Sequence, residues 1–112
     1  MIVNVISRGK AHVVALSGDF LAVEAASVRR VCQDLQDQGE LQLVIDFSEV
    51  DSVDGFSLAS LVGLRSRLRQ RGGDLALVGV NPDLRKRLQS AYLEQVFPIY
   101  STQAQAFEKL SP

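Results

Sequence analysis

Side chains that could do chemistry gather in residues 48–61, where the sequence reads SEVDSVDGFSLASL. After its first serine, the segment holds three acids and three more serines, namely Glu49, Asp51, Asp54, Ser52, Ser57 and Ser60. Such carboxylates and hydroxyls can cap a helix, bind a cation or accept a phosphoryl group. Which of these roles is open to them depends on the elements that hold the segment.

Nucleophilic catalysis and metal binding lack their usual residues in this sequence. His12 is the only histidine, and we expect it in a strand beside a turn, in a structural role. Cys32 is the only cysteine, and we expect it on the buried face of a helix. Because a metal site needs three or four such ligands together, we predict no catalytic residue, metal or cofactor, and hence no enzyme.

Composition indicates one globular domain that spans residues 1–112. Hydrophobic residues make up 46% of the chain and the formal net charge is -1, so nothing favours nucleic-acid binding. No stretch approaches the roughly 20 apolar residues of a membrane-spanning helix, which argues against direct membrane insertion. A lone cysteine and an N-terminus unlike a signal peptide favour the cytoplasm. The oligomeric state is left open.

Hydrophobic periodicity and turn residues predict the element order ββαβαβαβα, an α/β fold. The alternation of strands and helices favours a mixed, mostly parallel sheet with an N-terminal antiparallel hairpin, covered by about four helices. The expected elements are a hairpin of strands 2–6 and 12–16, a helix at 21–38, a strand at 43–47, a helix at 55–71, a strand at 75–80, a helix from Asn81 that includes Ala91, a strand at 96–100 and a final helix through Leu110.

The polar segment is predicted to be a loop between the central strand and the second helix. Asp54 is placed to cap that helix through the backbone N–H groups of Phe56 or Ser57. A phenylalanine in the first helical turn either packs inward against the loop or is displayed to a partner, and the sequence leaves both arrangements open.

Three segments together resemble the STAS domain family, which contains anti-sigma factor antagonists and the cytoplasmic tails of sulfate transporters. They are LSGDF at 16–20, LVIDFSEVDSVDGFSLASLVGL at 43–64 and NPDLRKRLQSAYLEQVFPIYSTQAQA at 81–106. The resemblance implies the same fold and, for stand-alone members, partner switching. In that switch an antagonist docks on an anti-sigma factor until a kinase phosphorylates the docking loop.

The sequence departs from the family motif at the phosphoacceptor. The motif is Asp, a phosphorylatable Ser or Thr, a small residue, Gly and Leu, whereas this chain has Asp54, Gly55, Phe56, Ser57 and Leu58. Gly55 has no hydroxyl, so the usual switch is not expected at that position. Ser57, or Ser52 upstream, is a weaker candidate for phosphorylation.

Three hypotheses about function follow from the resemblance and the loop. The first is a regulator resembling an anti-sigma factor antagonist, docking on an anti-sigma factor or serine kinase-like protein through residues 48–57 and the start of the second helix. Its predicted partner-binding residues are Ser52, Asp54, Gly55, Phe56 and Ser57. The second is a small STAS subunit of a phospholipid-transport ABC system that binds the ATPase. The third is a sensor of nucleotides or other small ligands.

Overall fold

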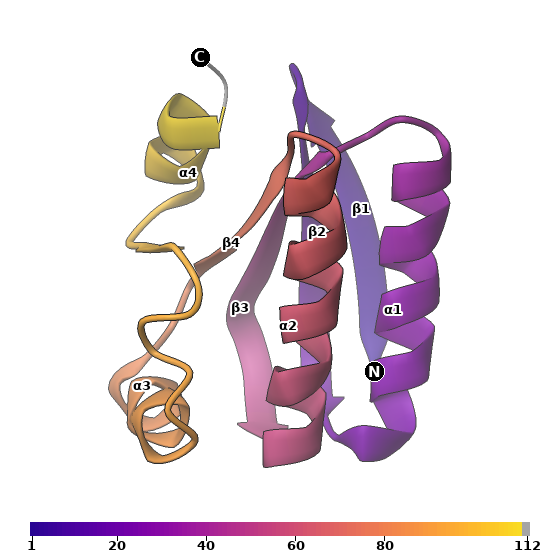
Figure 1. Ribbon diagram of the computed structural model, residues 1–112. Coiled ribbons are helices and arrows are strands. Elements are labelled where there is room, and N and C mark those ends of the chain that lie inside the picture. Colours follow the sequence, from indigo (N-terminus) through magenta and orange to yellow (C-terminus); the bar gives the residue numbers. More distant parts are fainter. Residues whose placement is uncertain (111–112) are drawn as a thin grey trace.

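The computed structural model describes residues 1–110 and contains the nine elements in the predicted order (Figure 1). These are β1 (Ile2–Arg8), β2 (Ala11–Phe20), α1 (Ala22–Asp37), β3 (Gln42–Val53), α2 (Gly55–Gln70), β4 (Asp74–Val78), α3 (Pro82–Ser90), β5 (Ile99–Tyr100) and α4 (Gln103–Leu110). The strands form one sheet in the order β1-β2-β3-β4-β5, with β1 antiparallel to β2 and the other neighbours parallel. The predicted mixed sheet with an N-terminal hairpin is confirmed.

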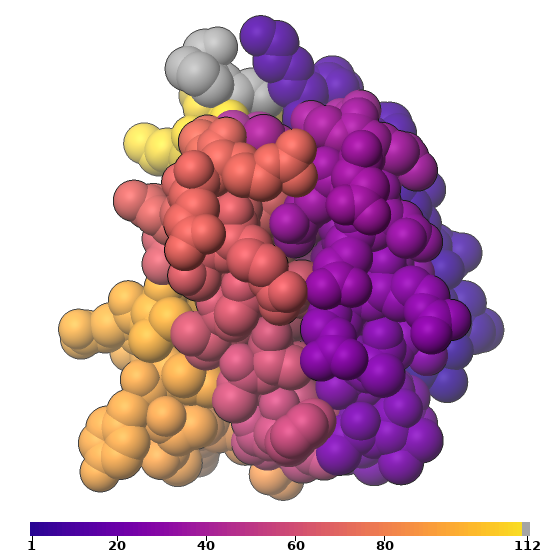
Figure 2. Space-filling view, turned by 45° about the vertical axis from the view of Figure 1, so that its right-hand side comes forward, coloured from indigo at the N-terminus to yellow at the C-terminus, as the bar shows by residue number. Residues whose placement is uncertain are grey.

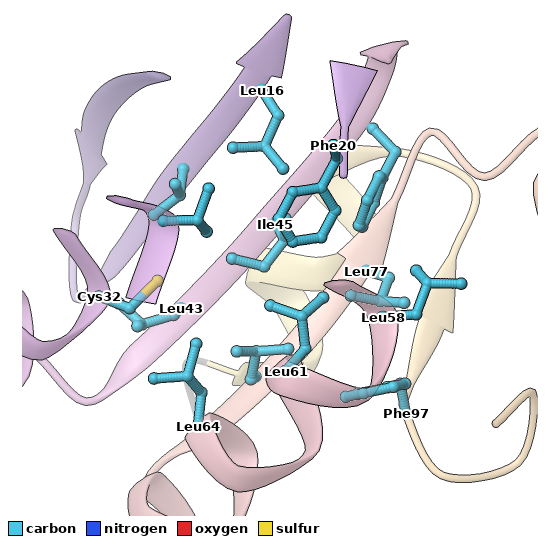
Figure 3. Close-up of a cluster of buried hydrophobic side chains, with 14 of the residues drawn as sticks. Leu16, Phe20, Cys32, Leu43, Ile45, Leu58, Leu61, Leu64, Leu77 and Phe97 are labelled. Atoms are coloured by element: carbon cyan, nitrogen blue, oxygen red, sulfur yellow. The ribbon is translucent and has the colours of Figure 1, made fainter. Parts of the chain in front are cut away.

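Alternating side chains of the strands build a separate apolar core on each face of the sheet. On one face, Val14, Ile45 and Leu77 pack with apolar residues of α1, α2 and α3. Figure 3 shows how closely the side chains of this larger core interlock. Cys32 lies within it, as predicted, and burial raises the pKa of its thiol to about 12.

Among residues 1–110, α4 is the helix that covers the opposite face of the sheet. Val13, Val44 and Val78 alternate with the residues of the first core, and they pack against Ala106 and Leu110 of α4. The terminal helix is therefore part of the fold, and the backbone N–H of Gln105 donates to the hydroxyl of Thr102 at its start. Within the described part of the chain, no helix has the length and apolar character needed to cross a membrane.

Two element boundaries differ from the sequence-based expectation for residues 91–98. Ala91 is the exposed C-cap of α3 and lies outside the helix. The last strand has two residues, not five, because the backbone N–H of Val96 bonds to the carbonyl of Leu93 in a turn. Pro98 has no N–H, so it contributes only its carbonyl, which accepts from Leu77.

The predicted loop at residues 48–53 is wrong, because β3 continues through them to Val53. Beyond Asp46, the last residue paired with β4, the strand pairs with β2 alone. This pairing carries two register shifts, which interrupt the regular alternation of buried and exposed positions. The polar residues at 48–52 therefore resemble a loop in sequence while they form the exposed end of a long strand.

Candidate functional site

The candidate site lies at one end of the sheet, where β2, β3 and β4 stop and α1, α2 and α3 begin (Figure 1). All three helices follow the carboxyl end of a parallel strand, the position at which α/β folds usually place their sites. Figure 2 shows α1 in purple and α2 in rose running side by side, with the starts of both helices at the bottom of the view. The site is thus built on the starts of these helices.

Asp54 joins the starts of two helices. Its Oδ1 accepts hydrogen bonds from the backbone N–H of Ser57, at 2.8 Å, and from the Ser57 hydroxyl, at 2.7 Å. Its Oδ2 accepts a third, at 2.8 Å, from the backbone N–H of Ala22 in the first turn of α1. The predicted cap of α2 is confirmed, and the same carboxylate also satisfies a free N–H group of α1.

These hydrogen bonds keep Asp54 ionised. The Ser57 hydroxyl, the Ser57 backbone N–H and the Ala22 backbone N–H, in that order of importance, lower the pKa of the Asp54 carboxyl below its ordinary value of 3.8. Because all three donors bond to the charged form, protonation would weaken the contact between the two helix starts.

Both serines that were considered as phosphoacceptors have hydroxyls that are already hydrogen-bonded. Ser57 is fully buried and donates to Asp54. Ser52 is half-buried and donates to Oδ1 of Asp19 at 2.7 Å, across the β2–β3 pairing. A kinase would reach the Ser57 hydroxyl only if the start of α2 opened; phosphorylation of either serine stays a prediction.

Phe56 is displayed, which decides between the two arrangements left open by the sequence. Its side chain is 67% exposed in the first turn of α2. Val23, in the first turn of α1, is 86% exposed. Because Asp54 holds these two first turns together, the exposed apolar residues belong to the same end of the molecule.

Gly55 stands between the capping carboxylate and Phe56, and it is exposed. Its φ lies outside the left-handed region, and a Cβ added to it would meet no atom within 4 Å. The backbone therefore does not require glycine here. A serine would fit this position.

An open hollow of about 290 Å³ separates the start of α2 from the end of α3. Gly55 and Leu58 line one side of it, and Arg87, Ser90 and Ala91 line the other. Among the residues that line the hollow, Arg87 is the one cation and Asp54 is the one acid. Residues 1–110 contain no cluster of three or more His, Cys, Asp or Glu side chains that could hold a metal ion.

Sequence reasoning missed or left undecided three contributors to this end of the molecule. Val23 lies off the inward stripe of α1, and only its place in the first turn could have drawn attention to it. Arg87 belongs to the run Arg85-Lys86-Arg87, whose placement depends on how α3 packs. The bond from Ala22 to Asp54 joins residues 32 positions apart, so no local pattern indicates it.

A family model for the STAS domain matches residues 3–106 of the chain. The chain belongs to the STAS domain family. The matched region covers the sheet from residue 3 onward and both helix starts bridged by Asp54, so the site described above lies inside it.

Curated relatives and solved structures agree with the family assignment. A putative anti-sigma factor antagonist of Thermotoga maritima is 29% identical over 80 residues, which is 71% of this chain and 71% of the relative. The anti-sigma F factor antagonist of Paenibacillus polymyxa is 24% identical over 107 residues, 88% of this chain and 85% of the relative. The crystal structure of a putative anti-sigma factor antagonist from Thermotoga maritima superposes with a TM-score of 0.89 at 22% identity, covering 98% of this chain and 95% of that one. This last likeness shows the shared fold.

Proposed function

We propose that this STAS protein is a regulator resembling an anti-sigma factor antagonist and that it works by docking on an anti-sigma factor or serine kinase-like partner. The docking surface consists of the end of β3, residues 48–53, together with the first turn of α2. Ser52, Asp54, Gly55 and Phe56 are its central residues. Ser57 was predicted among them, but it is fully buried and supports the surface only through its hydrogen bonds to Asp54. The names of the relatives support this class of partner.

The observation that carries the proposal is the display of Phe56. A large aromatic side chain left 67% exposed on a rigid helix start suits the centre of a protein interface, because such side chains bury much apolar area at little conformational cost. Asp54 holds the helix start in place before any partner arrives. The hollow beside Gly55 offers room for a side chain of the partner.

Gly55 gives this regulator a different form of control from the family's usual one. Without a hydroxyl at the acceptor position, a docked kinase has nothing to phosphorylate there. The complex therefore persists until the partner changes its own state or its abundance falls. Ser57 and Ser52 remain candidates for a displaced switch if the first turn of α2 opens.

The same glycine favours a second candidate function. A STAS subunit that binds the ATPase of a phospholipid-transport ABC system would need the docking surface but no phosphoacceptor. The exposed Phe56 suits either partner, so the identity of the captured protein decides between the two functions.

Affinity capture from the native extract tests the proposal. The wild-type protein should retain an anti-sigma factor or serine kinase-like protein, and Phe56→Asp should lose it, because a charge is placed at the centre of the contact. Ser66→Asp is the matched control: it adds the same charge to an exposed position of the same helix, about 15 Å further along.

Two results would contradict the proposed function. Retention of the same partner by Phe56→Asp and by the wild type would remove the start of α2 from the interface. Recovery of an ATPase together with a permease, in place of a kinase-like protein, would select the transport subunit. Loss of binding by Ser66→Asp as well would show that the effect is not specific to the docking surface.

A further inference from the structure

The edge strand β1 carries few of the features that normally protect a sheet edge, since its one charged residue, Arg8, stands at its end beside the hairpin turn. It is seven residues long and pairs with β2 alone. Residues 2–7 contain no charged side chain and no proline, and the register with β2 runs without a bulge. Natural edge strands are usually short, charged, bulged or interrupted by proline. The other edge, β5, follows that rule with only two residues.

The hairpin turn determines which backbone groups of β1 point outward. Arg8 pairs with Ala11 across a two-residue turn, with Gly9 at φ 61°, as in a type II′ hairpin. The pair that flanks such a turn exchanges hydrogen bonds, and bonded pairs alternate along an antiparallel ladder. The N–H and C=O groups of Val3, Val5 and Ser7 therefore face away from β2.

These outward groups are complementary to themselves. A two-fold axis through Val5 places Val5 opposite its own copy and Val3 opposite Ser7, so that about six backbone hydrogen bonds form between two antiparallel β1 strands. A register shifted by two residues forms fewer of these backbone hydrogen bonds. We propose that β1 is a homodimerisation edge, where a second copy of this chain continues the sheet with Val5 on the two-fold axis.

The side chains of β1 suit this partner. All residues of the strand except Val3 are exposed, and Ile2, Val5 and Ile6 are among the exposed large apolar residues of residues 1–110. Pairing would shield these side chains from water on both faces of the sheet. The formal charge of -1 per chain gives almost no repulsion between two copies.

The size of the contact determines how strong the dimer is. Pairing of a single seven-residue strand buries less than the roughly 1,200 to 2,000 Å² of a stable interface. The dimer is accordingly reversible and depends on concentration. This inference does not rest on the proposed docking surface, which lies at the starts of α1 and α2.

Charge substitution at the two-fold axis tests the proposal. Sedimentation velocity of the wild type should show a monomer–dimer equilibrium over a roughly hundred-fold range of concentration. Val5→Glu and Val5→Lys should each weaken the dimer about tenfold or more, because like charges then lie opposite each other. Mixing the two variants should restore association. Val23→Glu, at an exposed apolar position of α1, is the control and should leave the dimer unchanged.

Disulfide trapping tests the register independently. The two-fold axis places the Cα atoms of Val5 about 5.5 Å apart, within reach of a disulfide, whereas those of Ser7 lie roughly 14 Å apart. With diamide as oxidant, Val5→Cys should give a covalent dimer and Ser7→Cys should not, and the buried Cys32 does not compete. A wild-type protein that stays monomeric at the highest concentration, or equal cross-linking of the two variants, would overturn the proposal.

Discussion

Replacement of Gly55 by serine should restore a hydroxyl at the family's phosphoacceptor position without disturbing the fold. No atom lies within 4 Å of the added Cβ, and the φ of Gly55 is one that serine adopts. Serine is better than glycine in a helix by about 0.5 kcal/mol. At about 2.1 cal/mol/K per residue, the 112 residues unfold with an entropy of about 0.24 kcal/mol/K, so we expect Tm to rise by about 2 °C.

Thermal unfolding followed by circular dichroism measures this shift, and Gly79→Ser serves as the contrasting variant. Gly79 has a φ of 70°, and a Cβ there would overlap the side chain and the backbone of Ser48. We expect that variant to lose about 2 kcal/mol or more, which lowers Tm by about 8 °C. A comparable fall for Gly55→Ser would refute the view that the acceptor position is sterically open.

The same variant then tests whether Gly55 prevents phosphorylation at the proposed acceptor position. Incubated with the captured kinase-like partner and Mg²⁺–ATP, Gly55→Ser should be phosphorylated at position 55. The phosphoryl group adds about -1.5 to -2 charges next to Phe56 and should weaken binding about tenfold or more. Mass spectrometry locates the phosphate. Equal phosphorylation of the wild type at Ser57 or Ser52 would show that the switch has moved and was not lost.

Three further predictions concern residues outside the acceptor position. Asp54→Asn loses the hydrogen bond that the Asp54 carboxylate accepts from Ala22. Because folding lowers the pKa of Asp54, the ionised carboxylate stabilises the wild type at pH values above the ordinary pKa of 3.8. This stabilisation is lost as the pH falls through the lowered pKa of the folded state. Urea unfolding should therefore show a deficit for Asp54→Asn at pH 7 that shrinks below about pH 4. The Cys32 thiol, buried and with a pKa raised to about 12, should react with a thiol reagent only after unfolding. Gly73→Ala should lower the free energy of unfolding by about 3 kcal/mol or more, because the added Cβ would overlap the Leu41 carbonyl. Gly72→Ala should lower it by only about 1 kcal/mol, because Gly72 has a φ of 88° but open surroundings.

Much of the fold could be predicted because it follows from local patterns. Local signals mark the capping position of Asp54, the start of α3 at Pro82 and the apolar strand at 43–47. The strand predicted at 75–80 lies at Asp74–Val78, and Gly79 follows it with a φ of 70°. These signals determine the element order, and the handedness of strand–helix–strand connections then restricts the sheet.

The parts that could not be predicted depend on contacts between distant residues. The strand character of residues 48–53 comes from pairing with the end of β2, with which they share no sequence signal. The burial of Ser57 and the display of Phe56 depend on how α2 sits on the sheet, because both residues lie in the same helical turn. The double capping by Asp54 likewise required α1 and α2 to be placed side by side.

The two proposed contacts lead to a definite geometry when they are combined. A two-fold axis through Val5 reverses the direction of every strand in the second copy, so the carboxyl ends of β2 and β3 point in opposite directions in the two subunits. The docking surfaces at the start of α2 then lie at opposite ends of the dimer. Each copy can bind its partner without obstructing the other, and the complex should contain two copies of each protein. Because the docking surface does not include β1, Val5→Glu should change this stoichiometry to one of each while leaving the affinity of the single site intact.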